Sequence, residues 1–321
     1  MLFRNLIILF FCFFNLISGY SNNDLDNIIF PKAEILNAYT ARIPFKLVDH
    51  LIVIEAELLG KKGDFIIDTG SEALILNKIH FPFKYEYRET PKQTSGVVNT
   101  LDNTLEKQLK EFVISNLNLK NKISDVIDLS HIEKTKRMHL LGVIGFDILK
   151  DYEVFIDMYL NQITLTKVDK FGNKLDKKVY LEKITDSISF NLVNHTIVLN
   201  GFVNDKPLKF ALDTAAEFNQ INKNVSKKVL KNFRPNKRLE LIGAGNKKIE
   251  VLAGKLHLVK LNDTIYFGPM NTILTNLSKM SEAFGLNLDG VLGYEFFRQK
   301  RTIINYQKEK LYFVNNPITK Q

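Results

Sequence analysis

An internal repeat is the sequence feature that most constrains the fold of this chain. Residues 43–78 align without a gap to residues 188–223, at an offset of 145 positions. Fourteen of the 36 aligned positions hold the same residue type in both segments, and in the first segment they are Ile43, Phe45, Leu47, Val48, His50, Ile52, Val53, Lys61, Phe65, Asp68, Thr69, Glu72, Asn77 and Lys78. Further on, residues 142–147 match residues 290–295 at an offset of 148. The sequence therefore predicts two copies of one unit of about 145 residues.

Each copy carries one carboxylate directly after an apolar strand. The run 65–67 precedes Asp68, and the run 210–212 precedes Asp213. A carboxylate at the end of a buried strand is costly unless it is hydrogen-bonded or paired. Hydroxyls, backbone N–H groups and a flexible glycine follow the first carboxylate in Thr69, Gly70 and Ser71. A single strand that ends in Asp-Thr-Gly is also a common start of a hairpin, and the repetition is what favours an active site.

The Asp motifs and the downstream glycine segments form a matched set. Asp68-Thr69-Gly70-Ser71 with Val143-Ile144-Gly145 recurs as Asp213-Thr214-Ala215-Ala216 with Val291-Leu292-Gly293. This set resembles the aspartic peptidases, and the resemblance covers nearly the whole chain after residue 20. It implies that Asp68 and Asp213 form a catalytic pair in one cleft. It also implies that Thr69 and Thr214 interlock the two Asp loops, which the segments ending in Gly145 and Gly293 brace.

The resemblance implies a mainly β fold with two retropepsin-like β-barrel lobes, related by a pseudo-twofold internal duplication, and a few short helices. The predicted lobes are residues 21–175 and 176–321, after a signal peptide at residues 1–20. Short lobes without disulfides look more like two fused retropepsin-type units than a large eukaryotic pepsin. The residue pattern itself predicts a hairpin that leads into the Asp68 strand, with its turn at residues 60–63, and a matching turn at residues 204–207. Short helices are expected directly after Gly145 and Gly293.

The second Asp motif departs from the family pattern. Ala215 stands where glycine is expected, so the loop must widen slightly or the second copy has lost its function; we favour retained activity because Asp213 and Thr214 are both kept. Ala216 occupies the position that corresponds to Ser71 in the first copy. The Ser71 hydroxyl could donate a hydrogen bond to Asp68, whereas the Ala216 side chain has no donor for Asp213. Two neighbouring carboxyls share one proton, as in the well-known aspartic-peptidase pair, so we expect Asp68 to carry the charge and Asp213 the proton.

Glycine-containing polar segments lie between the two motifs of each copy, at Gly96 in the first copy and at Gly243 and Gly245 in the second. The resemblance implies that they are flaps over a bound peptide, and ordinary surface hairpins are the alternative. A nucleotide-binding loop is excluded at residues 243–245 because no third glycine follows at the required spacing. His50 and His195 occupy matching positions, and we expect them to be structural.

The first 20 residues predict a secretory signal peptide: a basic start, an apolar core and the small residues 18–19. The apolar core is short for a membrane span, so an uncleaved anchor is the weaker alternative. The single cysteine, Cys12, lies inside this segment. A mature protein without disulfides fits a bacterial envelope protein, so a periplasmic or secreted location is expected.

The amino-acid composition limits the kinds of molecule that the protein is expected to bind. The net charge of +9 comes from 44 Lys and Arg against 35 Asp and Glu, and the basic residues are spread along the chain. Dispersed charge indicates a solvated surface rather than a nucleic-acid site. No zinc-ligand spacing occurs, so neither a metal nor a cofactor is expected. The sequence predicts a monomeric aspartic endopeptidase that acts on peptides or proteins, without a membrane span once the signal peptide is removed. The alternative is a catalytically silent module that binds a peptide or an envelope polymer in the same cleft.

Overall fold

The computed structural model describes residues 6–7, 32–82, 88–95, 100–115, 117–177, 183–242 and 248–315. Its secondary structure is mainly β with a closed six-stranded barrel and few helices, which confirms the predicted class at this level. The predicted signal peptide lies outside the described residues except at positions 6–7. The division into lobes at residue 175 stays a prediction.

The first sheet is formed by the first half of the chain. Its nine strands are β1 (Leu6–Ile7), β4 (Lys46–Val48), β5 (Leu51–Leu58), β6 (Lys61–Ile67), β7 (Leu74–Asn77), β8 (Arg88–Ser95), β9 (Thr100–Ile114), β10 (Leu117–Ile127) and β11 (Leu140–Ile144). They follow the order β1-β8-β9-β10-β7-β11-β6-β5-β4, and β9 also pairs with β5. This additional pairing closes the six strands from β9 through β5 into a ring.

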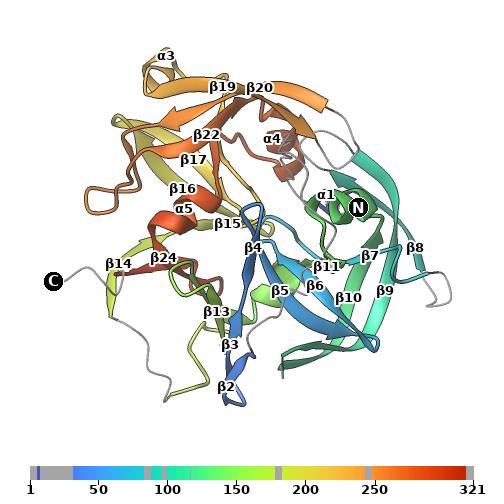
Figure 1. Ribbon diagram of the computed structural model, residues 1–321. Helices are drawn as coiled ribbons and strands as arrows, with labels where there is room; N and C mark the ends of the chain where they lie inside the picture. The colour runs from blue at the N-terminus through green and yellow to red at the C-terminus, as the bar shows by residue number, and fades with distance from the viewer. Residues whose placement is uncertain are drawn as a thin grey trace, which may run out of the picture.

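A second nine-stranded sheet is formed by the second half of the chain. Its strands are β15 (Asn191–Val193), β16 (Thr196–Val203), β17 (Lys206–Leu212), β18 (Asn219–Asn222), β19 (Phe233–Ile242), β20 (Lys248–Leu256), β21 (Val259–Lys260), β22 (Met270–Thr275) and β23 (Gly290–Leu292). The order is β15-β16-β17-β23-β18-β22-β20-β19, with β21 paired to β16. In Figure 1 the strands β16, β17, β19, β20 and β22 lie toward the top in yellow to orange.

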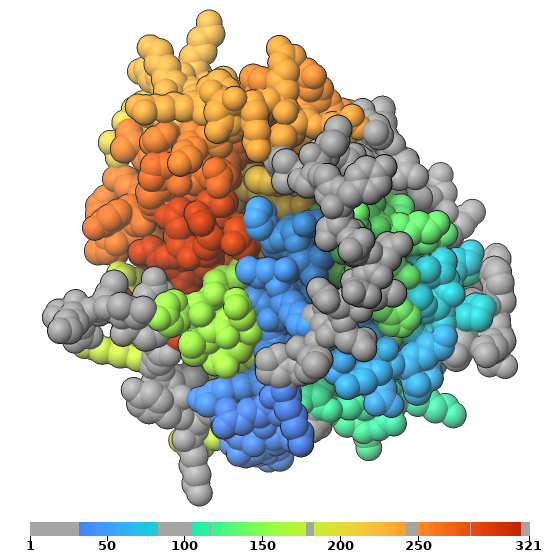
Figure 2. All heavy atoms as spheres, in the orientation of Figure 1, coloured from blue at the N-terminus to red at the C-terminus, as the bar shows by residue number. Residues whose placement is uncertain are grey.

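The third sheet joins strands from both halves. It consists of β2 (Glu34–Asn37), β3 (Thr40–Pro44), β12 (Tyr152–Asp157), β13 (Gln162–Lys167), β14 (Ile184–Ser189), β24 (Arg301–Asn305) and β25 (Lys310–Val314). Strands β12 and β24 pair antiparallel at its centre, with Glu153 opposite Asn305. A buried ion pair of 2.5 Å between Arg301 and Asp157 crosses the same junction. In Figure 2 the blue atoms from early in the chain pack directly against the red atoms from its end.

The described residues form five short helices: α1 (Ser130–Lys136), α2 (Phe146–Leu149), α3 (Lys227–Leu230), α4 (Ser278–Phe284) and α5 (Tyr294–Gln299). Helices α2 and α5 begin directly after Gly145 and Gly293, as the sequence predicted. Helices α1, α3 and α4 were not predicted. Among the described residues, none of the helices is both long and apolar enough to cross a bilayer.

Strand β6 shows how the apolar runs are used. Phe65 and Ile67 belong to the largest apolar cluster of the protein, whereas Ile66 belongs to a second cluster. Successive side chains of a strand point to opposite faces, so both faces of β6 are covered. A strand buried on both faces has a continuous apolar sequence rather than an alternating one. The run 65–67 is therefore a buried strand that delivers Asp68 into the interior.

Candidate active site

The Asp68 loop is held by backbone hydrogen bonds. Strand β6 pairs parallel with β11, and the N–H of Asp68 donates to the carbonyl of Ile144 at 3.0 Å. The Oδ1 of Asp68 accepts the N–H groups of Gly70 at 2.7 Å and Ser71 at 3.1 Å. Its Oδ2 has no hydrogen-bond partner within the described parts of the chain. The loop backbone therefore fixes one carboxyl oxygen, and the Asp68 carboxyl also interacts with that of Asp213.

The Asp213 loop has the same construction. Strand β17 pairs parallel with β23, and the N–H of Asp213 donates to the carbonyl of Leu292 at 2.9 Å. The Oδ1 of Asp213 accepts the N–H of Ala215 at 2.8 Å. The two loops are in contact, because a Cβ added to Gly70 would lie 2.8 Å from Cγ of Asp213 and 2.9 Å from its Oδ2. Glycine is required at position 70 by this close approach.

Thr69 and Thr214 bind the two loops to each other. The N–H of Thr69 donates to Oγ1 of Thr214 at 3.0 Å, and the N–H of Thr214 donates to Oγ1 of Thr69 at 3.0 Å. The hydroxyl of Thr69 donates onward to the Leu212 carbonyl at 3.1 Å, and that of Thr214 donates to the Ile67 carbonyl at 2.8 Å. All four hydrogen bonds are buried. They join strands β6 and β17 at their carboxyl ends, in the arrangement that the resemblance implied.

Gly145 and Gly293 pack against the two loops. A Cβ on Gly145 would lie 2.6 Å from the Ser71 carbonyl oxygen, and a Cβ on Gly293 would lie 2.2 Å from that of Ala216. The next residue donates its N–H to the same oxygen in each case, from Phe146 to Ser71 at 2.8 Å and from Tyr294 to Ala216 at 2.9 Å. A side chain at either glycine would push the segment away from its Asp loop.

Burial dominates the electrostatics of the two carboxyls. Asp68 is 0% exposed and Asp213 is 6% exposed. Burial raises the pKa of Asp68 well above its usual range, and the neighbouring Asp213 carboxylate raises it further. Burial also raises the pKa of Asp213, to about 6, against the lowering effect of the Ala215 N–H. The two carboxyls titrate as a coupled pair that shares one proton, and the stronger upward shift of the pKa falls on Asp68.

This assignment reverses the expectation from the sequence. The hydroxyl of Ser71 donates to the carbonyl of Ala73 at 3.4 Å rather than to Asp68. Ser71 contributes only its backbone N–H to the Asp68 carboxyl. The predicted donor that would have favoured ionised Asp68 is therefore wrong, and burial together with the Asp213 carboxylate raises the pKa of Asp68.

Ala215 fits into the apolar interior while the loop keeps its hydrogen bonds. Its methyl group is fully buried in the second apolar cluster, which otherwise consists of residues from the first half, among them Leu51, Val53 and Ile66. Ala216 is also fully buried and belongs to the third cluster with Val291. The two alanines therefore pack into different apolar clusters, and the hydrogen bonds of Thr214 and Asp213 are present.

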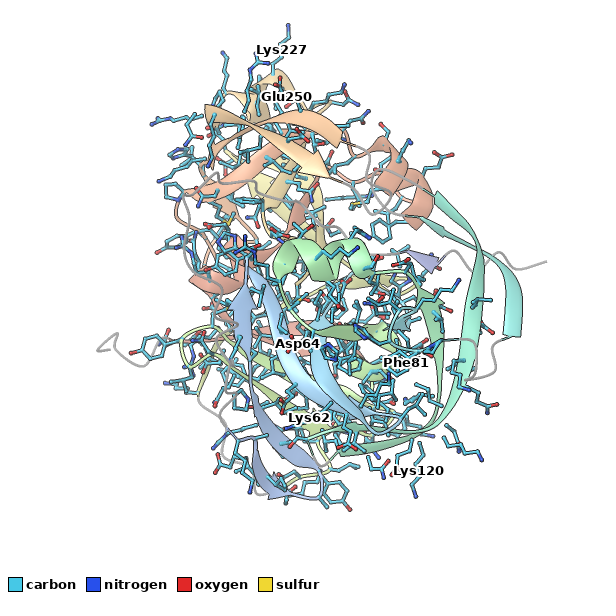
Figure 3. The ribbon with its side chains drawn as sticks, turned by 45° about the vertical axis from the view of Figure 1, so that its right-hand side comes forward. Lys62, Asp64, Phe81, Lys120, Lys227 and Glu250 are labelled. Atoms are coloured by element: carbon cyan, nitrogen blue, oxygen red, sulfur yellow. The ribbon has the colours of Figure 1, made fainter. Side chains whose placement is uncertain are left out.

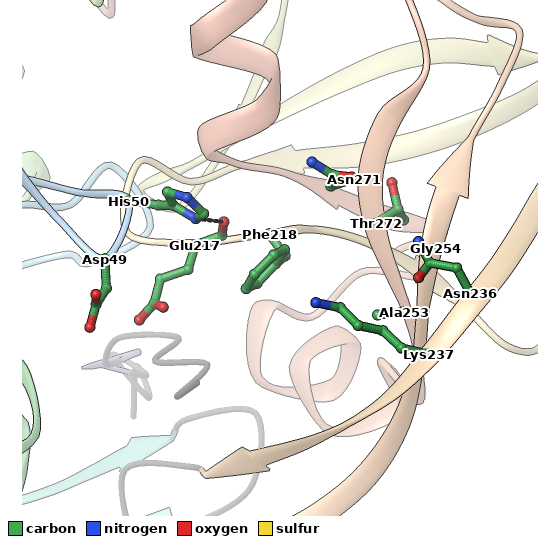
Figure 4. Close-up of a pocket in the computed structure, with 10 residues that line it drawn as sticks. All are labelled: Asp49, His50, Glu217, Phe218, Asn236, Lys237, Ala253, Gly254, Asn271 and Thr272. Carbon is green, nitrogen blue, oxygen red and sulfur yellow. Dashed lines mark hydrogen bonds between the residues drawn. The ribbon is translucent and has the colours of Figure 1, made fainter. Parts of the chain in front are cut away.

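A cavity of about 380 Å³ lies beside the Asp213 loop. It is lined by residues of the Asp213 loop, the β4–β5 turn and strands β19, β20 and β22: Asp49, His50, Glu217, Phe218, Asn236, Lys237, Ala253, Gly254, Asn271 and Thr272. Figure 4 shows His50 and Phe218 on one side of it and Lys237 and Asn271 on the other. This volume falls in the range of ligand pockets.

Two ionisable residues beside this cavity, Lys136 and Glu217, were not singled out from the sequence. The Nζ of Lys136 lies 2.6 Å from Oε1 of Glu217 and 3.1 Å from Oδ2 of Asp49. The side chains of Lys136 and Glu217 are buried. Burial raises the pKa of Glu217 to about 8, although Lys136 acts in the opposite direction. The repeat offered a signal for Glu217, which matches Glu72, but none for Lys136.

The two repeated histidines lie at contacts between the halves. The Nδ1 of His50 donates to the Glu217 carbonyl at 3.2 Å, and its ring stacks on Tyr294 at 4.2 Å. His195 is 2% exposed, its Nδ1 lies 4.0 Å from Oε2 of Glu72, and burial lowers its pKa to about 4. These contacts favour the structural role expected for both residues. The predicted flap glycines Gly96, Gly243 and Gly245 lie outside the described residues.

Comparisons with known proteins do not assign the chain. No family model matches it, and no curated protein matches it in sequence. Its functional interpretation therefore depends on the paired Asp motifs and on the geometry described above.

Proposed function

We propose that this protein is an aspartic endopeptidase in which Asp68 and Asp213 activate one water molecule. The observation that carries the proposal is the reciprocal contact of Thr69 and Thr214, residues separated by 145 positions. This contact holds the two Asp loops together at the ends of two buried strands. Two buried carboxyls with raised pKa values are the groups that acid–base hydrolysis of a peptide bond requires.

The proposed reaction uses the two carboxyls in different protonation states. Ionised Asp213 accepts a proton from the water as its oxygen attacks the scissile carbonyl carbon, and Asp68 donates its proton to the carbonyl oxygen. In the resulting diol, Asp213 returns its proton to the amide nitrogen as the C–N bond breaks, and Asp68 takes a proton from one hydroxyl. The products are a carboxylic acid and an amine, and the carboxyl pair regains its starting state.

A two-lobed duplicated architecture is part of this proposal. Its support is the matched pairing of the strands that flank each Asp. In the first half β6 pairs parallel with β11, which pairs antiparallel with β7, and in the second half β17, β23 and β18 pair in the same way. The strand that follows in each order, β10 or β22, pairs parallel with its neighbour. We propose that the lobes are two retropepsin-like units related by a pseudo-twofold axis.

The substrates proposed are peptides or proteins in an extended conformation. The cavity lined by Glu217 and Phe218 offers room for one substrate side chain. Glu217 follows Asp213 by four positions, so the cavity is close to the second Asp loop. We further propose that residues 1–20 direct the protein to a periplasmic or secreted location, where it acts as a monomer. The support for this location is the basic and apolar pattern of that segment.

Cleavage of denatured casein between pH 3 and 8, with and without a pepstatin-type inhibitor, tests the activity. We expect inhibitor-sensitive cleavage by the wild type, and its loss in Asp68→Asn and in Asp213→Asn. The matched control is Asp64→Asn, because Asp64 lies on the same strand and burial raises its pKa to about 6. This control should keep its activity.

The result also separates the alternative function. Intact casein at every pH, together with saturable binding of peptides by the folded protein, would support a binding module without catalysis. Cleavage that survives in both Asp variants would contradict the proposed chemistry. Because casein can miss a narrow specificity, the same comparison is made with a library of peptides analysed by mass spectrometry.

A further inference from the structure

Two histidines and a glutamate from three separate segments meet at helix α1. His80 lies in the turn after β7, Glu133 lies on α1, and His139 directly precedes β11. Their potential ligand atoms all lie within 4.8 Å of one another. The Nε2 of His80 is 2.6 Å from Oε2 of Glu133, and the two imidazole rings are 4.5 Å apart. No two of these residues share a spacing that the sequence analysis could recognise.

The carboxylate of this cluster is held in place by its neighbours. The Oε2 of Glu133 accepts the side-chain amide of Asn77 at 3.1 Å and the N–H of Leu140 at 3.1 Å. Asn77 is itself buried, and it also donates to the Leu140 carbonyl at 2.9 Å and accepts the Leu129 N–H at 3.0 Å. The N–H of His80 donates to the Asn77 carbonyl at 3.0 Å. Outer-sphere contacts of this kind orient metal ligands.

His139 is fixed at its backbone and open at its ring. Its N–H donates to Oδ2 of Asp64 at 3.1 Å, and its carbonyl accepts the Asp64 N–H at 2.9 Å. A Cβ on Gly63 would lie 2.6 Å from Cδ2 of His139, so the ring occupies space that any other residue at position 63 would fill. His139 is exposed, which leaves one side of the cluster accessible to an ion and to water. Figure 3 labels Asp64 on β6, below α1 in that view.

We propose that His80, Glu133 and His139 bind one divalent transition-metal ion, with zinc as the expected occupant. Two imidazole nitrogens and a carboxylate oxygen are a common zinc ligand set, with water in the fourth position. At zinc–ligand distances of about 2.0–2.2 Å, neighbouring ligand atoms in a tetrahedron are roughly 3.4 Å apart. The ion takes the place of the proton between His80 and Glu133, whose contact lengthens, and the exposed His139 ring turns inward.

The consequence of binding is structural. The ion connects the turn after β7, helix α1 and the start of β11. Helix α1 also carries Lys136, which pairs with Glu217, and β11 carries Ile144, whose carbonyl accepts the N–H of Asp68. The metal therefore stabilises segments that support the Asp loops, without contacting them. This inference does not depend on the proposed peptidase activity.

Metal binding is measured on the untagged full-length chain after removal of metals with a chelator. Zinc is titrated by calorimetry, and cobalt is titrated by visible absorption because tetrahedral cobalt has intense bands. The test variants are His139→Phe and His80→Phe, which keep an aromatic ring and remove the ligand. The matched control is His257→Phe, a half-buried histidine outside the cluster.

We expect one zinc ion per chain, with affinity at least ten-fold lower in either test variant and unchanged in the control. At zinc one hundred-fold above its dissociation constant, the melting midpoint should rise by roughly 5 °C in the wild type and the control, and not in His139→Phe. Absence of saturable binding by the folded wild-type chain would overturn the proposal. Unchanged affinity and cobalt spectrum in His139→Phe would also overturn it. If His80→Phe does not fold, the exposed His139 position decides.

Discussion

Removing the hydroxyls of Thr69 and Thr214 tests whether the two Asp loops are joined as described. Thr69→Val keeps the shape of the side chain but removes two buried hydrogen bonds, one to the Leu212 carbonyl and one from the Thr214 N–H. Thr214→Val removes the two equivalent bonds, to the Ile67 carbonyl and from the Thr69 N–H. The loss of each hydrogen bond leaves a buried N–H or carbonyl group unsatisfied, at a cost of about 1–3 kcal/mol. Each single variant loses two such bonds and should therefore lose roughly 2–6 kcal/mol of unfolding free energy.

The double variant should lose less than the sum of the two single losses. Once the two hydrogen bonds of one threonine hydroxyl are lost, the loops separate. Water can then hydrogen-bond to some of the N–H and carbonyl groups that the second hydroxyl had satisfied. We expect a coupling energy of about 1 kcal/mol between Thr69 and Thr214. Thr302→Val is the control, because the hydroxyl of Thr302, which is also buried, donates to the carbonyl of nearby Lys300 at 2.8 Å and to no other group in the described part of the chain.

Urea unfolding measures these energies. Because the chain has no tryptophan, far-ultraviolet circular dichroism and tyrosine fluorescence are the two probes. The control variant combined with Thr69→Val should show additive losses. If each threonine variant costs less than about 0.5 kcal/mol, or if their losses add within about 0.3 kcal/mol, the reciprocal contact is not what holds the loops together.

Three further predictions concern the close contact, the acid pair and the buried cation. Gly70→Ala places a methyl group 2.8 Å from Cγ of Asp213, so kcat/KM should fall about 100-fold. Gly268→Ala is the control, because the nearest atom to its added methyl group is 3.4 Å away, and its kcat/KM should not change. Equal activities of the two variants would refute this steric reasoning. Burial raises the pKa of Asp213 from 3.8 to about 6, so the folded state binds more protons between these values, and the stability present below pH 4 is lost as the pH rises through 6. In urea unfolding, the unfolding free energy of the wild type should fall by about 3 kcal/mol more than that of Asp213→Asn between pH 4 and 7. Parallel profiles of unfolding free energy against pH for the two proteins would contradict this. Lys136→Met leaves the Glu217 carboxyl buried without its cation and should lower the unfolding free energy by about 3 kcal/mol in the same assay. Adding Glu217→Gln should restore much of this lost unfolding free energy. A loss that the second change does not reduce would argue against the ion pair.

The local elements of the fold were predictable because periodicity and turn residues specify them. The hairpin of β5 and β6 was expected from an apolar strand pair around a glycine turn, and the hairpin of β16 and β17 from the matching turn. At that second turn, Asn204 and Asp205 have φ values of 48° and 58°, a conformation that Asn and Asp adopt more readily than most residues. Helices α2 and α5 followed from the repeated motif ending in Gly145 and Gly293.

Features that depend on tertiary distances were not predictable in the same way. Closure of the barrel depends on one pairing of β5 with β9, at Glu57 and Val113. The acceptor of the Ser71 hydroxyl depends on which oxygen atom the folded loop brings within reach, and in the structure it is the Ala73 carbonyl. Proximity in sequence to Asp68 was therefore a poor guide to the protonation of the acid pair.

The charged and metal-ligating clusters illustrate the same limit. Lys136 and Glu217 come from different halves, and His80 and Glu133 are separated by 53 positions. Helix α1 brings both clusters together, and its largely polar sequence carried no strong apolar period. Such sites require the position of a helix against two strands, which local patterns do not encode.

A crystal structure of the protein with a pepstatin-type inhibitor tests the central claim most directly. The account predicts that the central hydroxyl of the inhibitor lies within about 2.6–3.2 Å of a carboxyl oxygen of both Asp68 and Asp213. An inhibitor bound elsewhere, or two carboxyl groups that cannot reach one common oxygen atom, would contradict it.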